Sequence, residues 1–346
     1  MSIRVLVVDD SALIREVLTR TLGRDGDIEV VGLATDPIEA REKIKTLNPD
    51  VVTLDIEMPN MNGLAFLDKL MRLHPLPVVM VSTLTKRGAS ETLLALELGA
   101  VDFVAKPSAD LSGGLENFGL DLREKVRAAA HSRVRAQSQR ATAQKVVTAQ
   151  APDGTIIAIG ASTGGVDAVR AVLLPLPTDS PPIVITQHMP AGFTKRFAAR
   201  LNELCALNVV EAEDRMVLKP GHAYVAPGDN HMRVEHGSGH FRARLGQDDL
   251  ISGHRPSVDA LFQSVAQAAG SWAVGIILTG MGRDGAAGLK LMRDAGAYTI
   301  GQSQASALVY GMPRVAFEEG AVMEQAPVEA IAARLAAALQ RLKPAA

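Results

Sequence analysis

Short apolar runs alternate along the chain with longer stretches in which apolar residues recur at helical spacing. The first five runs are Ile3–Val8, Glu29–Ala34, Val51–Leu54, Val78–Val81 and Val101–Val104. Runs of this length are typical of strands buried on both faces of a parallel sheet, and the stretches between them are typical of amphipathic helices. The pattern predicts a doubly wound parallel sheet near the N-terminus.

The same alternation returns in the second half of the chain. Its predicted strands are Thr155–Gly160, Pro182–Gln187, Ala273–Thr279 and Tyr298–Gly301. Between the second and the third lies Ala223–Leu245, where apolar and polar residues alternate and glycines recur, which is typical of an antiparallel ribbon. We therefore expect an α/β protein with two doubly wound parallel-sheet domains, the second of them Rossmann-like and carrying an inserted antiparallel hairpin.

The two patterns are separated by a stretch with few large apolar residues. A last helix of the first domain is expected from about Leu115 to Ala130, and Ser132–Gln150 is rich in Ala, Gln, Arg, Ser and Thr. This composition is typical of a linker. The predicted division is a first domain over 1–125, a linker over 126–153 and a second domain over 154–346. The basic residues around the linker lack interleaved aromatic residues, so a solvated tether is favoured over a nucleic-acid site.

The composition excludes several classes of protein. A chain of 346 residues with 47% hydrophobic and 21% charged residues is typical of folded domains, and a net charge of −2 gives no reason to expect a nucleic-acid partner. No apolar stretch reaches membrane-spanning length, so no direct membrane insertion is expected. The single cysteine, Cys205, fits a reducing cytoplasm, and its helix-like spacing among leucines predicts a core residue rather than a nucleophile. We expect a cytoplasmic protein.

Polar residues follow four of the five predicted strands of the first domain. Asp9 and Asp10 follow the first strand, Asp55 the third and Ser82 the fourth, and Lys106 lies just past the fifth. The carboxyl ends of parallel strands share one edge of a sheet, so we expect these side chains to meet. Three carboxylates together suit Mg²⁺, and a metal ion with a lysine neutralises an incoming phosphoryl group. The set predicts an aspartyl-phosphate site with Asp55 as the acceptor.

The second domain begins with an apolar strand that ends in a glycine-flanked serine, Ser162. A serine at a strand's carboxyl end and near a helix N-terminus is placed to act as a nucleophile, with backbone N–H groups nearby to stabilise an oxyanion. Serine is also a favoured helix N-cap, and this stretch alone favours the cap. The nucleophile hypothesis therefore requires a base and an orienting acid elsewhere in the domain.

Candidates for the base and for the orienting acid also lie at the carboxyl ends of predicted strands. His188 follows the second strand of this domain and Asp284 follows the third, so each is expected at the edge that holds Ser162. Asp284 is also placed to cap a helix over Gly285–Met292. The histidines of the ribbon, His231, His236 and His240, lack regular metal-ligand spacing, and surface positions are favoured for them over a zinc site. The sequence thus offers serine, histidine and aspartate for a nucleophilic triad, with geometry untested.

The first domain resembles response-regulator receiver domains, and this resemblance implies a flavodoxin-like fold. The resemblance is carried by Val-Val-Asp9-Asp10-Ser, Leu-Asp55-Ile-Glu-Met-Pro, Val-Met-Val-Ser82-Thr and Leu-Gly-Ala-Val-Asp-Phe-Val-Ala-Lys106-Pro107. It implies that Asp9, Asp10, Asp55 and the carbonyl of Glu57 hold Mg²⁺ and that Asp55 accepts a phosphoryl group from a histidine kinase. It also implies that Ser82 and Lys106 report phosphorylation. The Lys106–Pro107 bond is often cis in receivers.

The second domain resembles the effector domain of chemotaxis protein-glutamate methylesterases. The motifs are Gly-Ala-Ser162-Thr-Gly-Gly, Gln-His188-Met-Pro, Leu-Thr-Gly-Met281-Gly-Arg-Asp284-Gly and Tyr-Gly-Met-Pro-Arg. The resemblance implies hydrolysis of glutamate γ-methyl esters, and deamidation of certain glutamines, on chemoreceptors. Ser162 is the implied nucleophile, His188 the general base and then acid, and Asp284 its orienter, with the N–H groups of Met281 and Thr163 in the oxyanion hole. No cofactor is expected for this hydrolysis.

The resemblance also implies regulation by the receiver, which is expected to cover the edge holding Ser162 until Asp55 is phosphorylated. One departure from the family pattern falls at Ser303–Gln304, where acidic residues are more usual, and it concerns substrate preference. Two other classes of function remain. A response regulator whose second domain only binds a partner would use Ser162 as a helix cap. A transcriptional regulator would require a basic helix-turn-helix, and the sequence offers none.

Overall fold

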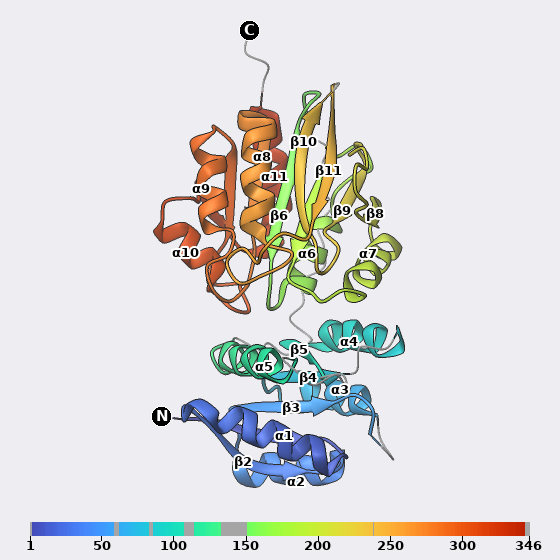
Figure 1. The fold of residues 1–346 in the computed structure, drawn as a ribbon, viewed down its shortest axis with the longest axis vertical. Helices are drawn as coiled ribbons and strands as arrows, with labels where there is room; N and C mark the ends of the chain where they lie inside the picture. The colour runs from blue at the N-terminus through green and yellow to red at the C-terminus, as the bar shows by residue number, and fades with distance from the viewer. Residues whose placement is uncertain are drawn as a thin grey trace. The chain divides into compact units, whose positions relative to one another are not determined.

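The computed structural model describes residues 2–58, 62–82, 86–106, 114–132, 151–237 and 239–342. The chain divides into two compact units, Met1–Arg140 and Ala141–Ala346, and each is described by itself (Figure 1). The predicted domain limits at 125 and 153 stay a prediction. The linker residues 133–150 and the bond to Pro107 lie outside the described residues.

The first unit is a five-stranded sheet with the order β2-β1-β3-β4-β5, and every neighbouring pair is parallel. This is the flavodoxin-like order. The strands are β1 Ile3–Val8, β2 Ile28–Ala34, β3 Val51–Asp55, β4 Val78–Ser82 and β5 Asp102–Ala105. The helices are α1 Ala12–Leu22, α2 Pro37–Leu47, α3 Gly63–Leu73, α4 Lys86–Leu98 and α5 Gly114–Ala130, with a short 3₁₀ turn η1 at Gly23–Asp25.

Local sequence explains where the helices of this unit begin. Ser11, Asp36 and Asn62 each accept a backbone hydrogen bond from the first turn of α1, α2 and α3 respectively. Such caps satisfy N–H groups that a helix leaves unpaired. The central strands β3 and β4 are buried along their whole length, which explains their continuous apolar sequence.

The second unit is a seven-stranded sheet with the order β14-β13-β12-β6-β7-β9-β8, again with every neighbouring pair parallel. Its strands are β6 Ile156–Ala161, β7 Ile183–Gln187, β8 Asn208–Glu211, β9 His222–Val225, β12 Ala273–Ile277, β13 Tyr298–Gln302 and β14 Glu324–Ala326. Its helices are α6 Gly165–Leu173, α7 Phe193–Leu204, α8 Val258–Ala269, α9 Ala286–Asp294, α10 Met312–Glu318 and α11 Val328–Arg341, with a 3₁₀ turn η3 at Gly270–Trp272.

The strand order of the second unit reverses at its first strand. From β6 the chain moves to β7, β8 and β9 on one side and then returns to place β12 on the other side of β6. A reversal of this kind opens a crevice at the carboxyl ends of the strands, which is where open α/β sheets bind ligands. The segments after β6, β7 and β12 therefore carry the side chains most favourably placed for chemistry.

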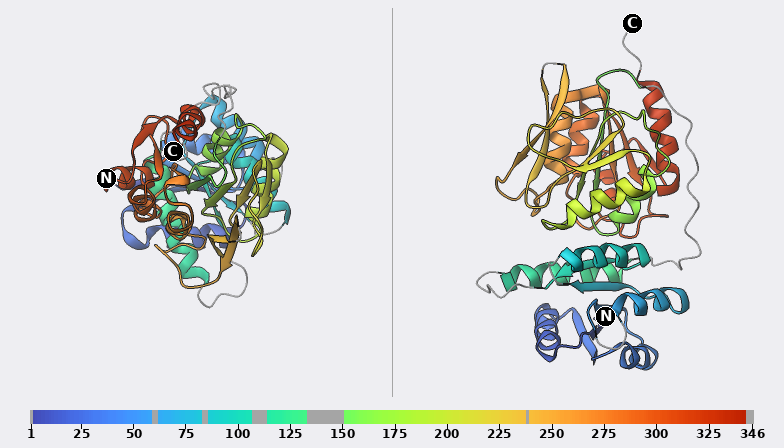
Figure 2. Two further views of the ribbon diagram at one scale, coloured as in Figure 1. Left: turned by 90° about the horizontal axis from the view of Figure 1, so that it is seen from above. Right: turned by 90° about the vertical axis from the view of Figure 1, so that its right-hand side faces the viewer.

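The hairpin predicted in the second unit is present and packs on the outside of the sheet. Strands β10 His231–Gly237 and β11 His240–Gly246 pair antiparallel, and β10 lies against α8. Met232 and Val234 are buried while the intervening Arg233 is partly exposed, so the ribbon has one apolar face. In the right-hand view of Figure 2, the hairpin and α11 lie on opposite sides of the seven-stranded sheet.

The predicted fold class is confirmed, with corrections in detail. The ribbon was expected to begin at Ala223, but residues 222–225 form β9, which is parallel to β7. The expected strand Ala273–Thr279 ends at Ile277. Strands β8 and β14 were not predicted, because they have only four and three residues and lie toward the edges of the sheet. Runs this short carry too little periodicity to be recognised.

Candidate functional site

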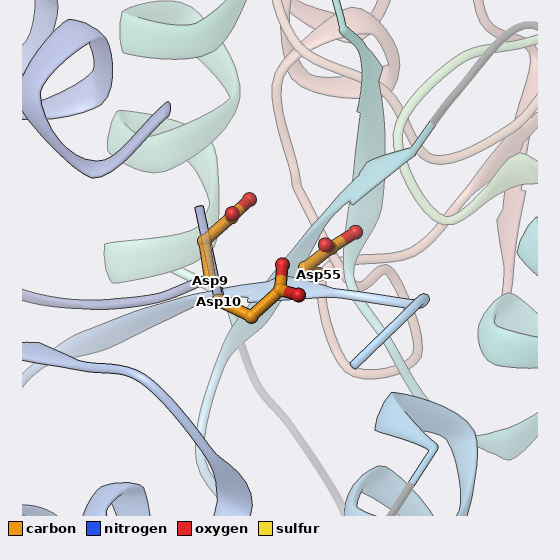
Figure 3. Close-up of side chains that lie close together, drawn as sticks. All are labelled: Asp9, Asp10 and Asp55. Carbon is orange, nitrogen blue, oxygen red and sulfur yellow. The ribbon is translucent and has the colours of Figure 1, made fainter. Parts of the chain in front are cut away.

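The acids predicted at the edge of the first unit come together. Asp9 and Asp10 follow β1 and Asp55 ends β3, and one oxygen from each lies within 4.8 Å of the others (Figure 3). Asp9 and Asp55 are buried, whereas Asp10 is exposed. Three carboxylate oxygens this close form a donor set that fits a hard, oxygen-binding cation such as Mg²⁺. In the part of the chain that the structure describes, no other group of this kind is found, and the ribbon histidines form none.

Lys106 lies against the same carboxylates. Its Nζ is 2.8 Å from Oδ2 of Asp55 and 2.9 Å from Oδ2 of Asp9. Burial raises the pKa of Asp55 to about 6, against the opposing effect of Lys106, and the charge of Asp9 adds to the rise. Burial alone would lower the pKa of Lys106, but its two acidic partners raise it. The lysine is therefore a fixed cation beside the carboxylate predicted to accept a phosphoryl group.

Ser82 and Glu57 lie in the segments that the sequence indicates. Ser82 ends β4 beside β3, it is buried, and its hydroxyl accepts a hydrogen bond of 2.9 Å from Thr92 in α4. The backbone N–H of Glu57 donates to Asp55 at 3.4 Å. The reporting role of Ser82 and the metal contact of the Glu57 carbonyl stay predictions.

Two residues of this site were missed from the sequence. The Nη1 of Arg15 donates to the backbone carbonyls of Asp9 and Asp10, at 2.8 and 3.0 Å, and so holds the acidic turn. A Cβ at Gly63 would lie 2.1 Å from the carbonyl oxygen of Asp55, so only glycine lets α3 begin this close to the acceptor. Arg15 could have been recognised from the sequence, because it lies one turn into the helix that follows the two acids.

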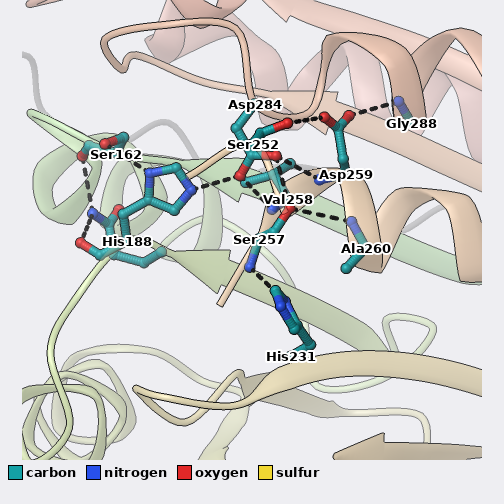
Figure 4. Close-up of polar contacts among 11 residues, drawn as sticks. Ser162, His188, His231, Ser252, Ser257, Val258, Asp259, Ala260, Asp284 and Gly288 are labelled. Carbon is teal, nitrogen blue, oxygen red and sulfur yellow. Dashed lines mark hydrogen bonds and ion pairs between the residues drawn. The ribbon is translucent and has the colours of Figure 1, made fainter. Parts of the chain in front are cut away.

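In the second unit, Ser162, His188 and Asp284 form one chain of hydrogen bonds. Ser162 follows β6, His188 follows β7 and Asp284 lies in the turn before α9. Nδ1 of His188 lies 3.1 Å from the hydroxyl of Ser162, and Nε2 lies 2.7 Å from Oδ2 of Asp284 (Figure 4). His188 and Asp284 are largely buried, with side-chain exposures of 10% and 1%. The His188 ring thus faces the serine with Nδ1 and the aspartate with Nε2, whereas the two nitrogens are exchanged in chymotrypsin-like triads. The same three side chains are joined in both cases.

The hydroxyl of Ser162 is not the cap of a helix. Helix α6 begins at Gly165 after Gly164, and no side chain caps it. Gly164 has a φ of +76°, a backbone conformation that glycine adopts readily, and it turns the chain sharply after the serine. A Cβ at Gly165 would lie 1.9 Å from Oε1 of Gln187, whose Nε2 donates to the carbonyl of Ser162 at 2.9 Å. The turn leaves the serine hydroxyl directed at His188.

Asp284 is held by a helix other than the one predicted. Helix α9 begins after Gly285 without a side-chain cap. The carboxylate of Asp284 instead accepts from the first N–H groups of α8, those of Val258 at 2.7 Å and Asp259 at 3.0 Å, and from the hydroxyl of Ser257 at 2.8 Å. Burial would raise its pKa, but the hydrogen bond from His188 and these backbone donors lower it overall. The helix dipole at this end of α8 also favours the anion.

The turn that carries Met281 lies against Ser162. The N–H of Ser162 donates to the carbonyl of Thr279 at 3.0 Å, and a Cβ at Gly280 would lie 2.8 Å from Cβ of Ser162. Gly311 supports the turn from behind, since its own Cβ would lie 3.1 Å from Cα of Met281. Among the described residues, no hydrogen bond takes up the backbone N–H of Met281.

Thr163, the other residue predicted for the oxyanion hole, is buried, and its carbonyl accepts from the hydroxyl of Thr279 at 2.9 Å.

Two other predictions concern residues away from the triad. Gln304 is exposed and Ser303 is partly exposed, and their effect on substrate preference stays a prediction. Cys205 is the residue after α7 and is only partly buried, so it is not the core residue expected; burial raises the pKa of its thiol to about 11, which keeps the thiol neutral.

One ribbon histidine was placed wrongly from the sequence. His231 was favoured as a surface residue, but it is fully buried. Its Nδ1 accepts from the N–H of Ser257 at 3.2 Å, and its Nε2 lies 3.0 Å from the carbonyl of Asp249. It therefore supports the cap residue that in turn holds Asp284. Sequence analysis also missed His254, whose ring stacks on His188.

Fold and site together define a response regulator whose second domain is built as a serine hydrolase. Comparison with known families agrees with this division. Residues 5–112 match the response regulator receiver domain, and residues 157–335, more than half of the chain, match the CheB methylesterase family. The chain belongs to the CheB methylesterase family.

Relatives and solved structures support this membership over nearly the whole chain. A protein-glutamate methylesterase/protein-glutamine glutaminase of Caulobacter vibrioides is 58% identical over 326 residues, covering 93% of this chain and 94% of its own. One from Geobacter metallireducens is 52% identical over 344 residues, covering 96% and 95%. The crystal structure of the Thermotoga maritima CheB methylesterase catalytic domain matches at a TM-score of 0.53 with 38% identity, covering 54% of this chain and 99% of that chain. The predicted family is confirmed.

Proposed function

We propose that this protein is a phosphorylation-regulated hydrolase that removes methyl groups from glutamate γ-methyl esters, and deamidates certain glutamines, on chemoreceptors. The observation that carries the proposal is the continuous hydrogen-bonded chain from Ser162 through His188 to Asp284. The relatives' names, protein-glutamate methylesterase/protein-glutamine glutaminase, support this choice of substrate.

The mechanism follows from the orientation of the His188 ring. Because Asp284 accepts from Nε2–H, Nδ1 carries a free lone pair toward the hydroxyl of Ser162. Ser162 attacks the γ-carbonyl carbon while its proton passes to Nδ1, and the imidazolium then gives this proton to the leaving methoxide or amide. Methanol or ammonia departs and leaves an acyl-serine. Water, deprotonated by His188, hydrolyses that ester and returns the serine.

The oxyanion formed in both steps requires N–H donors beside Ser162. We assign this role to the backbone N–H groups of Met281 and Thr163, because the turn after Thr279 packs directly against the serine. Such donors stabilise charge that develops only in the transition state, and losing one typically lowers the rate by about 10² to 10³.

The first unit is proposed to control this activity through Asp55. The carboxylates of Asp9, Asp10 and Asp55, with the carbonyl of Glu57, are the residues that would hold Mg²⁺, which neutralises phosphoryl oxygens when bound. Asp55 accepts the phosphoryl group from a histidine kinase. Lys106 balances the charge on it, and Ser82 responds to it. We propose a cytoplasmic location. Among the described helices, none is long and apolar enough to cross a membrane.

The test is methanol release from methylated receptor membranes, with and without a phosphodonor. We expect Ser162→Ala to abolish release and Asp55→Asn to abolish only its stimulation by the phosphodonor. If Ser162→Ala releases methanol at the wild-type rate, the second domain is a binding module and the proposed mechanism is wrong.

A further inference from the structure

The imidazole of His188 has a second aromatic neighbour that the triad does not require. The ring of His254 stacks on it with centroids 3.8 Å apart and an angle of 18° between the planes. His254 lies in the segment between β11 and α8 and, like His188, is partly buried. One face of the catalytic ring is therefore covered by a second flat ring.

The segment that carries His254 is fixed at several points. Arg255 donates to Asp229 through Nε and Nη2, at 3.0 and 2.7 Å, and through Nη1 to the carbonyls of residues 247 and 248. Ser252 donates to Asp259 at 3.0 Å, and His254 and Ile251 exchange backbone hydrogen bonds. These contacts tie the segment to α8 and to the residues on either side of the hairpin, so they fix the position of His254.

A flat neighbouring ring can restrict the orientation of His188 because the terminal torsion of histidine is soft. Rotation of a ring about its bond to Cβ is broad and roughly two-fold, whereas the bonds to Ser162 and Asp284 require a single ring plane. Reacting groups must be held within a fraction of an ångström for full rate. Stacking at van der Waals distance allows the ring to lie in that plane and excludes tilted orientations.

We propose that His254 is a positioning residue for the nucleophilic reaction. It holds the ring of His188 in the plane that joins Ser162 to Asp284, and it needs only its flat face to do so. This inference deepens the proposed function and rests on it. The requirement for a ring, and not for a second proton carrier, separates this role from general acid or base chemistry.

The experiment compares full-length His254→Ala and His254→Phe with wild type. The control is His240→Ala, an exposed histidine on β11 outside the triad's hydrogen-bond chain. The first readout is the rate at which a fluorophosphonate labels Ser162, which requires no receptor. We expect His254→Ala to lower labelling and kcat by about 10- to 100-fold with KM unchanged, and His254→Phe to restore most of both. Thermal unfolding shows which variants are folded.

Two results would overturn the inference. One is that Ser162 of His254→Ala is labelled at the wild-type rate, or that this variant shows only a raised KM with kcat unchanged. The other is a folded His254→Phe that is as slow as His254→Ala, which would mean that the imidazole itself acts. Ser162→Ala separates this from a failure of the proposed function. If Ser162→Ala still labels, the triad mechanism fails, whereas normal labelling of His254→Ala, with none in Ser162→Ala, refutes only the role of His254.

Discussion

Replacing Asp284 with asparagine tests the hydrogen-bond chain at its most buried member. Both oxygens of the Asp284 carboxylate accept from donors: Oδ2 from His188 and Val258, and Oδ1 from Ser257 and Asp259. An amide has one oxygen, so one pair of donors must face an NH₂ group. The favoured orientation turns NH₂ toward Ser257, whose hydroxyl can rotate to accept, and leaves only the N–H of Asp259 without a partner.

The expected loss of activity follows from charge. In this orientation the amide oxygen still accepts from His188, so the His188 ring keeps its proton on Nε2. The negative charge beside the imidazolium, however, is gone. Two unit charges about 4 Å apart interact by about 4 kcal/mol at an effective dielectric constant near 20, which corresponds to about 10³ in kcat. The opposite orientation would also reverse the tautomer and raise the loss to about 10⁴.

The same substitution should destabilise the second unit. One unpaired N–H at the start of α8 costs about 1–3 kcal/mol of unfolding free energy. The pKa of Asp284 is lowered by folding, so its ionisation contributes stability above about pH 4, and this contribution is lost as the pH falls further. The difference in stability between wild type and Asp284→Asn should therefore shrink in acid.

The assays are methanol release for kcat and urea unfolding between pH 7 and pH 3. The matched control is Asp294→Asn, a carboxylate-to-amide change at an exposed position of α9, which should leave both unchanged. Ser162→Ala should abolish activity with little loss of stability. If Asp284→Asn keeps nearly wild-type kcat while Ser162→Ala is inactive, the carboxylate does not act on His188 and the reasoning is refuted.

Three further predictions follow from close contacts. Gly280→Ala places a Cβ 2.8 Å from that of Ser162, so kcat for methanol release should fall by about 10- to 100-fold; an unchanged kcat would mean that the turn adapts. Gly63→Ala places a Cβ 2.1 Å from the carbonyl oxygen of Asp55, so phosphorylation by a small-molecule donor should slow; wild-type rates would contradict this. Ser257→Ala removes the cap of α8 and should cost about 1 kcal/mol in urea unfolding, and equal stability would refute the assigned cap.

The sequence was most informative where a strand ends in a reactive residue. In a parallel sheet all carboxyl ends share an edge, so the position of a residue just after an apolar run already assigns it to that edge. This rule found Asp9, Asp55 and Lys106 in one unit and Ser162 and His188 in the other. The structure brings each set together.

The rule could not identify residues that reach the site from elsewhere. Asp284 was correctly paired with His188, but its helix partner was predicted from chain proximity, and it is held by α8, whose start lies 26 residues upstream. His231 was assigned to the surface because histidines in turns are more often exposed than bound to zinc, whereas this one is buried and contacts the cap residue of α8. Contacts of this kind depend on how the hairpin folds back, which no local pattern encodes.

The sequence by itself determined the two sheets, their order along the chain, the carboxylates for a phosphoryl group and the three members of the triad. It did so because parallel strands and helix starts have local signatures. Only the tertiary structure decided that α8, and not α9, holds Asp284, and that His254 covers the ring of His188. The reason is physical: side chains far apart in sequence orient one another only when packing brings their elements together.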